Sequence, residues 1–178
     1  LASQLWKTGN ADAMMLATMI VDPKEMTESD LHSWAESIQY YVVADMFVRD
    51  IVTCSPHARR CMDVWRNSTR EYVAQCGWDL VALAALNDKD LPDTPFAITI
   101  ERIEKGIASA PNRVRHAMNN ALIAIGLRND SLRTKALAAA SRIGKVNVDH
   151  GQTGCKTPDA AEYITKTLAI CMVCGGPA

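Results

Sequence analysis

The sequence predicts an all-α protein, and three observations support this fold class. Apolar residues recur at helical spacing along most of the chain, and no stretch alternates apolar and polar residues as a half-buried strand does. Ala, Leu, Ile and Met are plentiful whereas aromatic residues make up 6% of the chain, a composition that favours helices over sheets. The chain also contains only 9 glycines and 7 prolines, which argues against a loop-rich β protein. A hydrophobic fraction of 48% further excludes intrinsic disorder as its main state.

Start and stop signals place the first two helices. Helical periodicity predicts one helix over Ser3–Ile20, and Asp22-Pro23 ends it. Thr27 is the candidate N-cap of the next helix, because acidic residues follow it in the first turn. The apolar positions of this second helix recur at helical spacing, at Leu31, Trp34, Ile38 and Tyr41.

Capping signals also mark the helices that follow. A Ser or Thr N-cap with proline at the first helical position occurs at Ser55-Pro56, Thr94-Pro95 and Thr157-Pro158. Ser68-Thr-Arg-Glu71 has the pattern of a capping box, and Asp130 or Ser131 is a candidate cap further on. The helices predicted after residue 70 are Tyr72–Leu86, Phe96–Ala110, Asn112–Leu127, Leu132–Ile143 and Ala160–Ala169.

Short links between about seven to nine helices make consecutive helices antiparallel neighbours. Several such pairs stacked in a row form an α-α superhelix, a HEAT-like repeat solenoid with a period of about 40 residues. A compact helical bundle is the structural alternative. The length of 178 residues fits one domain spanning residues 1–178.

Targeting signals and metal motifs are not apparent in the sequence. No apolar run reaches the roughly 18–20 residues that cross a bilayer, and no charged-then-apolar leader is visible. We therefore expect a cytoplasmic protein with no membrane partner and with reduced cysteines. Cys171-Met-Val-Cys174 is a C-x-x-C pair, but a structural zinc needs four ligands and no second pair has matching spacing. We accordingly expect no metal ion and no cofactor.

Charge is unevenly distributed along the chain, although the net charge is −1. Residues 1–100 contain 8 Lys/Arg and 14 Asp/Glu, whereas residues 101–178 contain 11 Lys/Arg and 6 Asp/Glu. Such asymmetry indicates a surface in the second part that faces a polyanion. The alternative is a mildly basic, solvated face.

Asp45 is the candidate catalytic residue. It lies in an otherwise apolar stretch, and burying an unpaired carboxylate on an apolar face is costly. Tyr41 is four residues earlier and shares its helix face. A carboxylate beside an aromatic ring suits the stabilisation of a cationic transition state, such as the oxocarbenium ion formed when a glycosidic bond breaks. The alternative is that Asp45 is partly exposed or is paired with Arg49 at i+4.

Two basic segments are candidate phosphate-binding regions. Arg113, His116 and Asn120 fall on one helix face, and arginine and amide groups suit phosphate oxygens. The segment Ile143–Pro158 is dense in glycine, polar groups and lysines, and it leads into a helix N-terminus, which offers free N–H groups to an anion. The alternative is an ordinary surface loop in which the glycines serve only as turn residues.

The chain resembles the AlkD-like DNA alkylation repair family, whose members are HEAT-like helical solenoids. The likeness is carried by residues Leu5–Ala17, by the helix containing Tyr41–Asp45 and by the helix around Arg113–Ile125. The tail Ile143–Ile164 is similar to that of a subgroup with a Val-Asp-His-Gly and Cys-Lys-Thr-Pro pattern. The likeness spans nearly the whole chain, and we expect the family's first helices to be missing from it.

The resemblance implies excision of positively charged N3- or N7-alkylated purines from duplex DNA. Asp45 matches the family's catalytic aspartate, and Tyr41 stands in the place of a tryptophan four residues before it. Gln75 falls where the family has a catalytic-site arginine, and Asn120 falls where it has a second groove tryptophan. Gln cannot clamp a phosphate as Arg does, and Asn offers no aromatic face to a cationic base.

Two hypotheses about function follow. In the first, the chain is a DNA glycosylase that binds alkylated duplex DNA on a concave face; Asp45 stabilises the sugar cation and orients water, and Tyr41 contacts the lesion or backbone. The residues expected to contact DNA are Gln75, Arg113, Arg115, His116, Asn120, Lys145 and Lys156. In the second, the chain is a catalytically inactive relative whose solenoid serves as a scaffold for nucleic acid or protein.

Overall fold

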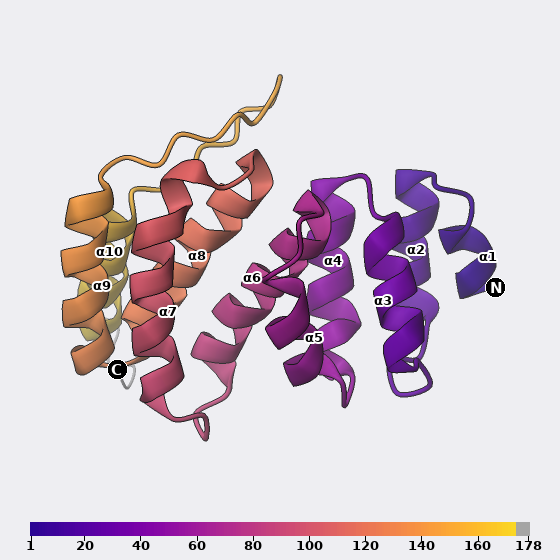
Figure 1. The fold of residues 1–178 in the computed structure, drawn as a ribbon, viewed down its shortest axis with the longest axis horizontal. Coiled ribbons are helices and arrows are strands. Elements are labelled where there is room, and N and C mark those ends of the chain that lie inside the picture. The colour runs from indigo at the N-terminus through magenta and orange to yellow at the C-terminus, as the bar shows by residue number, and fades with distance from the viewer. Residues whose placement is uncertain (174–178) are drawn as a thin grey trace. The chain divides into compact units, whose positions relative to one another are not determined.

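A computed structural model describes residues 1–173 of the chain, with side chains described through residue 169. Within residues 1–173 every regular element is helical, which confirms the predicted all-α class (Figure 1). Two short 3₁₀ helices, η1 and η2, cover Val52–Cys54 and Ile107–Ser109. The α-helices are α1 (Ala2–Trp6), α2 (Ala11–Ile20), α3 (Glu28–Ser37), α4 (Tyr41–Asp50), α5 (Ala58–Trp65), α6 (Glu71–Asn87), α7 (Asp93–Gly106), α8 (Asn112–Arg128), α9 (Asp130–Ile143) and α10 (Ala160–Val173).

The chain divides into two compact units, and the boundary falls inside α6. The first unit covers Leu1–Val81 and the second begins at Ala82. In the first, α2 packs on both α1 and α4. In the second, α8 packs on α7, α9 and α10, and α9 also packs on α7 and α10. No helix within residues 1–173 is both long enough and apolar enough to span a membrane.

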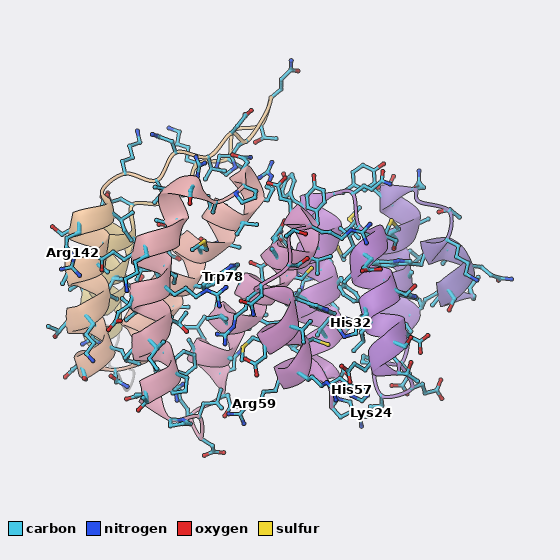
Figure 2. The ribbon with its side chains drawn as sticks, in the orientation of Figure 1. Lys24, His32, His57, Arg59, Trp78 and Arg142 are labelled. Atoms are coloured by element: carbon cyan, nitrogen blue, oxygen red, sulfur yellow. The ribbon has the colours of Figure 1, made fainter. Side chains whose placement is uncertain are left out.

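Four aromatic residues form the core of the first unit. The rings of Trp6 and Trp34 stack with centroids 4.2 Å apart, and Phe47 stacks on Trp65 at 6.0 Å. Such pairs contribute about 0.5–1.5 kcal/mol each beyond the area that they bury. Trp65 is buried, and its Nε1–H donates to Nδ1 of His32, labelled in Figure 2, at 2.6 Å. The core therefore buries the indole ring without leaving its N–H unsatisfied.

Helix α8 is the centre of the second unit. Its segment from residue 121 to 126 is buried on every side, which identifies it as a core helix rather than an amphipathic surface helix. A Cβ added at Gly126 would lie 2.6 Å from Cδ1 of Ile164 and 3.0 Å from Cβ of Ala136. This glycine therefore allows α9 and α10 to approach α8 closely.

Two predicted helices are each interrupted by a turn. The helix expected over Ser3–Ile20 breaks at Gly9, whose φ is +66°, a conformation that favours glycine. Asn10 then caps α2, and its side chain accepts from the N–H of Ala13 at 3.1 Å. The helix expected to continue from Leu31 to Tyr41 ends at Ser37, and α4 starts again at Tyr41. At the first place a glycine turn and a capping side chain override a continuous hydrophobic period; at the second, α4 begins without a side-chain cap.

Some capping signals are confirmed and others are displaced by a few residues. Thr27 and Asp30 form the capping box of α3. Ser55-Pro56 lies two residues ahead of α5, whose N-cap is His57, and the Ser55 hydroxyl accepts from the His57 N–H. The Ser68 hydroxyl accepts from Arg70 N–H, one residue before α6 starts. Asn129 caps α9 in place of the expected Asp130 or Ser131.

We predict that Gly77→Ala destabilises the fold strongly. A Cβ at Gly77 would lie 2.1 Å from the backbone nitrogen of Arg66, so the backbones at the end of α5 and in α6 would have to separate. We expect a loss at or above the roughly 1–3 kcal/mol of ordinary overpacking, measured by urea denaturation. Gly106→Ala is the matched control, because its added Cβ would meet Cε of Met118 at an ordinary 3.5 Å. Equal denaturation midpoints for the two variants would contradict this account of α5–α6 packing.

Candidate functional site

Asp45 is exposed on α4, whose other face packs into the core. Val43, Ala44, Phe47 and Val48 are buried, whereas Asp45 is exposed. The carboxylate is therefore not enclosed by apolar groups, and this agrees with the partly exposed alternative. The guanidinium of Arg49, the partner offered by i+4 spacing, instead donates to Asp50 through two bonds of 2.6 and 2.9 Å.

Gln75 connects Asp45 to the interior of the first unit. Its side chain is 4% exposed on α6, and its Nε2 donates to Oδ1 of Asp45 at 2.7 Å. The same Nε2 lies 3.3 Å from the backbone carbonyl of Tyr41, the first residue of α4. A neutral amide thus fixes the orientation of the carboxylate without adding a positive charge to it. Burial at this level also leaves Gln75 too little surface for a direct contact to a DNA phosphate.

Two further titratable groups of α6 lie near Asp45. Asp79 is half-buried, and desolvation, followed by the charge of Asp45, raises the pKa of its carboxyl well above the ordinary value. Burial first, and then the charges of Asp79 and Asp45, also raise the pKa of the Cys76 thiol. Cys76 is therefore a protonated, unreactive thiol at neutral pH. Asp79 was not among the predicted site residues, although its position four residues after Gln75 was a usable signal.

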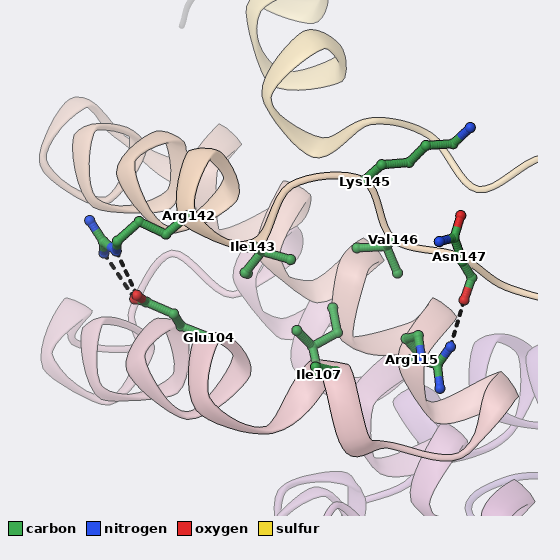
Figure 3. A pocket seen from close by; sticks show the side chains of 9 residues that line it. Glu104, Ile107, Arg115, Arg142, Ile143, Lys145, Val146 and Asn147 are labelled. Carbon is green, nitrogen blue, oxygen red and sulfur yellow. Dashed lines mark hydrogen bonds and ion pairs between the residues drawn. The ribbon is translucent and has the colours of Figure 1, made fainter.

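In the second unit, side chains of α8 hold the segment between α9 and α10 against the helix. Arg115 donates to the backbone carbonyls of Asn147, at 2.8 Å, and of Ala110, at 3.0 Å; Figure 3 shows the first of these bonds. Asn112 and the backbone of Asp149 exchange two hydrogen bonds, both of 2.7 Å. The side chains of Arg115 and Asn112 therefore have a structural role, because their hydrogen bonds fix the path of the segment between α9 and α10.

Thr157 joins this segment to two histidines. Its Oγ1 lies 3.2 Å from Nδ1 of His116 and 2.9 Å from Nε2 of His150, and the two rings meet edge to face at 5.3 Å. Burial, followed by the charges of His150 and Arg113, lowers the pKa of His116 from 6.5. His116 is accordingly neutral at physiological pH and serves as a hydrogen-bond partner rather than as a cation. Thr157, expected as a helix cap, holds the loop instead.

The remaining predicted DNA contacts also lie in the second unit. Lys145 and Lys156 are exposed on the segment between α9 and α10, whereas Arg113 and Asn120 are half-buried on α8. A cavity of about 350 Å³ lies beside this segment; its lining includes Lys145, Arg115 and the ion pair between Arg142 and Glu104. In Figure 3 the ammonium group of Lys145 points away from that ion pair. The cavity is thus bordered by cations whose charge is partly compensated by Glu104.

Metal ligands do not cluster in the part of the chain that the structure describes. There, no group of three or more His, Cys, Asp or Glu side chains could hold a metal ion. Of the predicted C-x-x-C pair, Cys174 lies outside the described residues, and the Cys171 side chain lies beyond the last one described.

Comparison with known proteins identifies the family. Residues 1–164 match the family described as DNA alkylation repair enzyme. The chain belongs to this family. The match runs from α1 to Ile164 in α10, so it includes residues of both units.

Two curated relatives and one solved structure match most of the chain. An uncharacterized protein of Listeria innocua is 29% identical over 167 residues, which are 93% of this chain and 72% of the relative. An uncharacterized protein of Listeria monocytogenes is 28% identical over 168 residues, with the same coverage of 93% and 72%. A solved structure is described as "a new family of proteins related to the HEAT-like repeat DNA glycosylases with affinity for branched DNA structures". It superposes with a TM-score of 0.84 at 30% identity, covering 96% of this chain and 73% of that one. The predicted HEAT-like fold class is thereby confirmed.

We predict that acid loosens the second unit through His116. Because its pKa is lowered in the folded state, the unfolded chain binds a proton that the folded chain does not, and stability falls as the pH drops below about 6.5. His116→Gln should reduce this dependence while retaining a group that can bond Thr157. Thermal unfolding between pH 5 and 7.5 measures the effect, with His57→Gln as the control. An unchanged dependence in His116→Gln would exclude His116 as its source.

Proposed function

We propose that the protein binds DNA and that its Asp45 site excises N3- or N7-alkylated purines from duplex DNA. Family membership supports a role in DNA repair, and the structural relative described above has affinity for branched DNA. The observation that carries the catalytic part of the proposal is the Gln75–Asp45 contact. It holds a carboxylate in a fixed orientation while leaving that carboxylate accessible from solvent.

The chemistry that this contact suits is the cleavage of an N-glycosidic bond. The C1′–N bond breaks, its electron pair leaves with the alkylated purine, and a positive charge develops on the sugar. The charge of Asp45 stabilises that cation, and its carboxylate accepts a hydrogen bond from the water that adds to C1′. As the C1′–O bond forms, that water gives its proton to the carboxylate, which passes it on to solvent. An alkylated purine is already a good leaving group, so no general acid is required.

The strength of this electrostatic effect depends on whether DNA excludes water from the site. Two opposite charges 4 Å apart attract by about 1 kcal/mol in water but by about 4 kcal/mol at the effective dielectric constant near a protein surface. The first value accelerates a reaction about fivefold and the second nearly a thousandfold. Asp45 is exposed in the unbound protein, so we expect it to become effective only when bound DNA covers it.

Phosphate binding is assigned in this proposal mainly to the second unit. Lys145 and Lys156 extend from a segment that Asn112, Arg115 and His116 hold in place. Arg115 and His116 thus contribute by shaping the segment that presents the lysines, and Arg113 and Asn120 on α8 remain candidates for direct contacts. Tyr41 remains the candidate for contact with the lesion or the backbone.

The second candidate function is a scaffold that binds branched DNA without catalysis. Gln75, at the position where the resemblance places an arginine, supplies neither a positive charge nor a phosphate clamp. Its burial beneath Asp45 also removes it from direct contact with DNA. The affinity of the structural relative for branched DNA favours this candidate as well.

We expect Asp45→Asn to separate the two candidates. Asparagine keeps the shape of the side chain but removes the charge, so the single-turnover release of methylated purines should fall about 10²- to 10³-fold. The measurement is chromatography of free bases released from methylated duplex DNA. Asp12→Asn, the same change at an exposed position on α2, serves as the control. Absence of release by the wild-type protein would leave the scaffold as the explanation of DNA binding.

We further expect Lys145→Ala together with Lys156→Ala to weaken DNA binding. If each lysine neutralises one phosphate, the slope of log K against log salt should become shallower by about 2. Affinity is measured for a four-way junction and for a duplex of the same sequence across a salt series. The matched control replaces Lys7 and Lys24, two exposed lysines of the first unit. Equal effects of the two double variants would show that net charge, not this segment, determines binding.

A further inference from the structure

Two buried acceptors on α6 have no hydrogen-bond partner. They are Oε1 of Gln75 and Oδ2 of Asp79. The two residues are four positions apart on one helix, so their side chains are neighbours on the same face. Buried polar atoms are nearly always bonded, and each exception calls for a physical explanation.

A single proton on Asp79 would satisfy both atoms. An ionised carboxylate and an amide oxygen are both acceptors, so neither can bond the other. A protonated carboxyl group has one O–H donor, and the side chain of Gln75, four residues earlier, has an acceptor without a hydrogen bond. Protonation therefore converts two unsatisfied acceptors into a donor and its acceptor.

Ionisation of Asp79 would act on Asp45 through the same amide. Nε2 of Gln75 has two hydrogens, and it already lies within bonding distance of Oδ1 of Asp45 and the carbonyl of Tyr41. An ionised Asp79 would be a third, charged acceptor for that group, and charge-assisted hydrogen bonds are stronger than neutral ones. Ionisation of Asp79 therefore draws the Gln75 amide away from Asp45, and the Asp45 carboxylate becomes less well oriented.

We infer that Asp79 is a positioning residue whose proton holds the Gln75 amide against Asp45. The inference rests on the proposed function only where it concerns catalysis; the proton-dependent support of Asp45 is a property of the protein itself. Asp79 does not touch the substrate in this scheme, and it acts through Gln75.

The electrostatic surroundings of Asp79 agree with this role. Burial and the negative charge of Asp45, from α4, raise the pKa of Asp79, whereas the Gln75 amide, which as a donor favours the ionised carboxylate, opposes the rise. Cys76, also on α6, interacts with the charge of Asp79, and burial raises the pKa of its thiol, which is protonated at neutral pH. Burial and the charge of Asp45 thus favour retention of the proton on Asp79.

The direct test is a pH titration of the full chain by NMR. Side-chain carboxyl carbons are followed for Asp79 and Asp45, and the side-chain amide of Gln75 is followed in parallel. We expect Asp79 to titrate well above the ordinary aspartate pKa of about 3.9, with the Gln75 amide shifting at the same midpoint. Titration of Asp79 in the ordinary range, or a Gln75 amide that does not respond, would overturn the inference.

The functional readout is the pH profile of purine release at a fixed salt concentration. In the wild-type protein, release should fall by up to about tenfold for each pH unit above the midpoint found for Asp79. Asp79→Asn keeps a neutral donor for Gln75, so this alkaline decline should disappear, whereas Asp12→Asn should retain it. Persistence of the decline in Asp79→Asn would contradict the role of Asp79. Failure of the wild-type protein to release purines would refute the proposed activity alone, because the NMR titration decides the inference independently.

Discussion

The hydrogen bond between Gln75 and Asp45 is the contact on which the candidate site depends. It links a side chain that is 4% exposed to a carboxylate on the surface, across 2.7 Å. The depth of Gln75 in turn requires α6 to lie very close to α5, and Gly77, two residues later, permits that approach because it has no Cβ. The orientation of one surface charge is therefore set by backbone packing that leaves no room for a side chain.

In the second unit the polar residues of α8 act mainly on the protein itself. Arg115 binds backbone carbonyls, Asn112 exchanges bonds with the backbone of Asp149, and His116 bonds Thr157. The number of basic residues in the sequence therefore overstates the cationic surface, because a guanidinium whose terminal nitrogens already bond backbone carbonyls binds a phosphate less readily. Lys145 and Lys156 differ, since they are exposed on the segment that these bonds fix.

The fold class and most helices could be predicted from the sequence because they depend on local signals. The Thr27–Asp30 capping box and the limits of α8 are encoded within a few residues. The breaks at Gly9 and after Ser37 were missed because a hydrophobic period can continue through a turn. The resemblance placed Gln75 near the site, but the role of Gln75 depends on Asp45, 30 residues away in the sequence. The role of Thr157 likewise depends on a distant partner, a histidine 41 residues away. Such pairs are set by tertiary packing and leave no periodic trace in the sequence.

The group that holds Asp45 affects two proposed tasks in opposite ways: stabilisation of the sugar cation and attraction of the DNA phosphates. An arginine in place of Gln75 would orient the carboxylate and attract phosphate, but its charge would offset the field that a sugar cation experiences. A neutral amide does not itself offset the charge of Asp45, and it does not attract phosphate, so attraction of DNA must come from other residues. The excess of cations after residue 100 and of acids before it fits this separation, because phosphates and a developing cation require fields of opposite sign. In the proposed function, with a neutral amide holding Asp45, stabilisation of the cation and retention of the polyanion depend on different residues, and each can change without loss of the other.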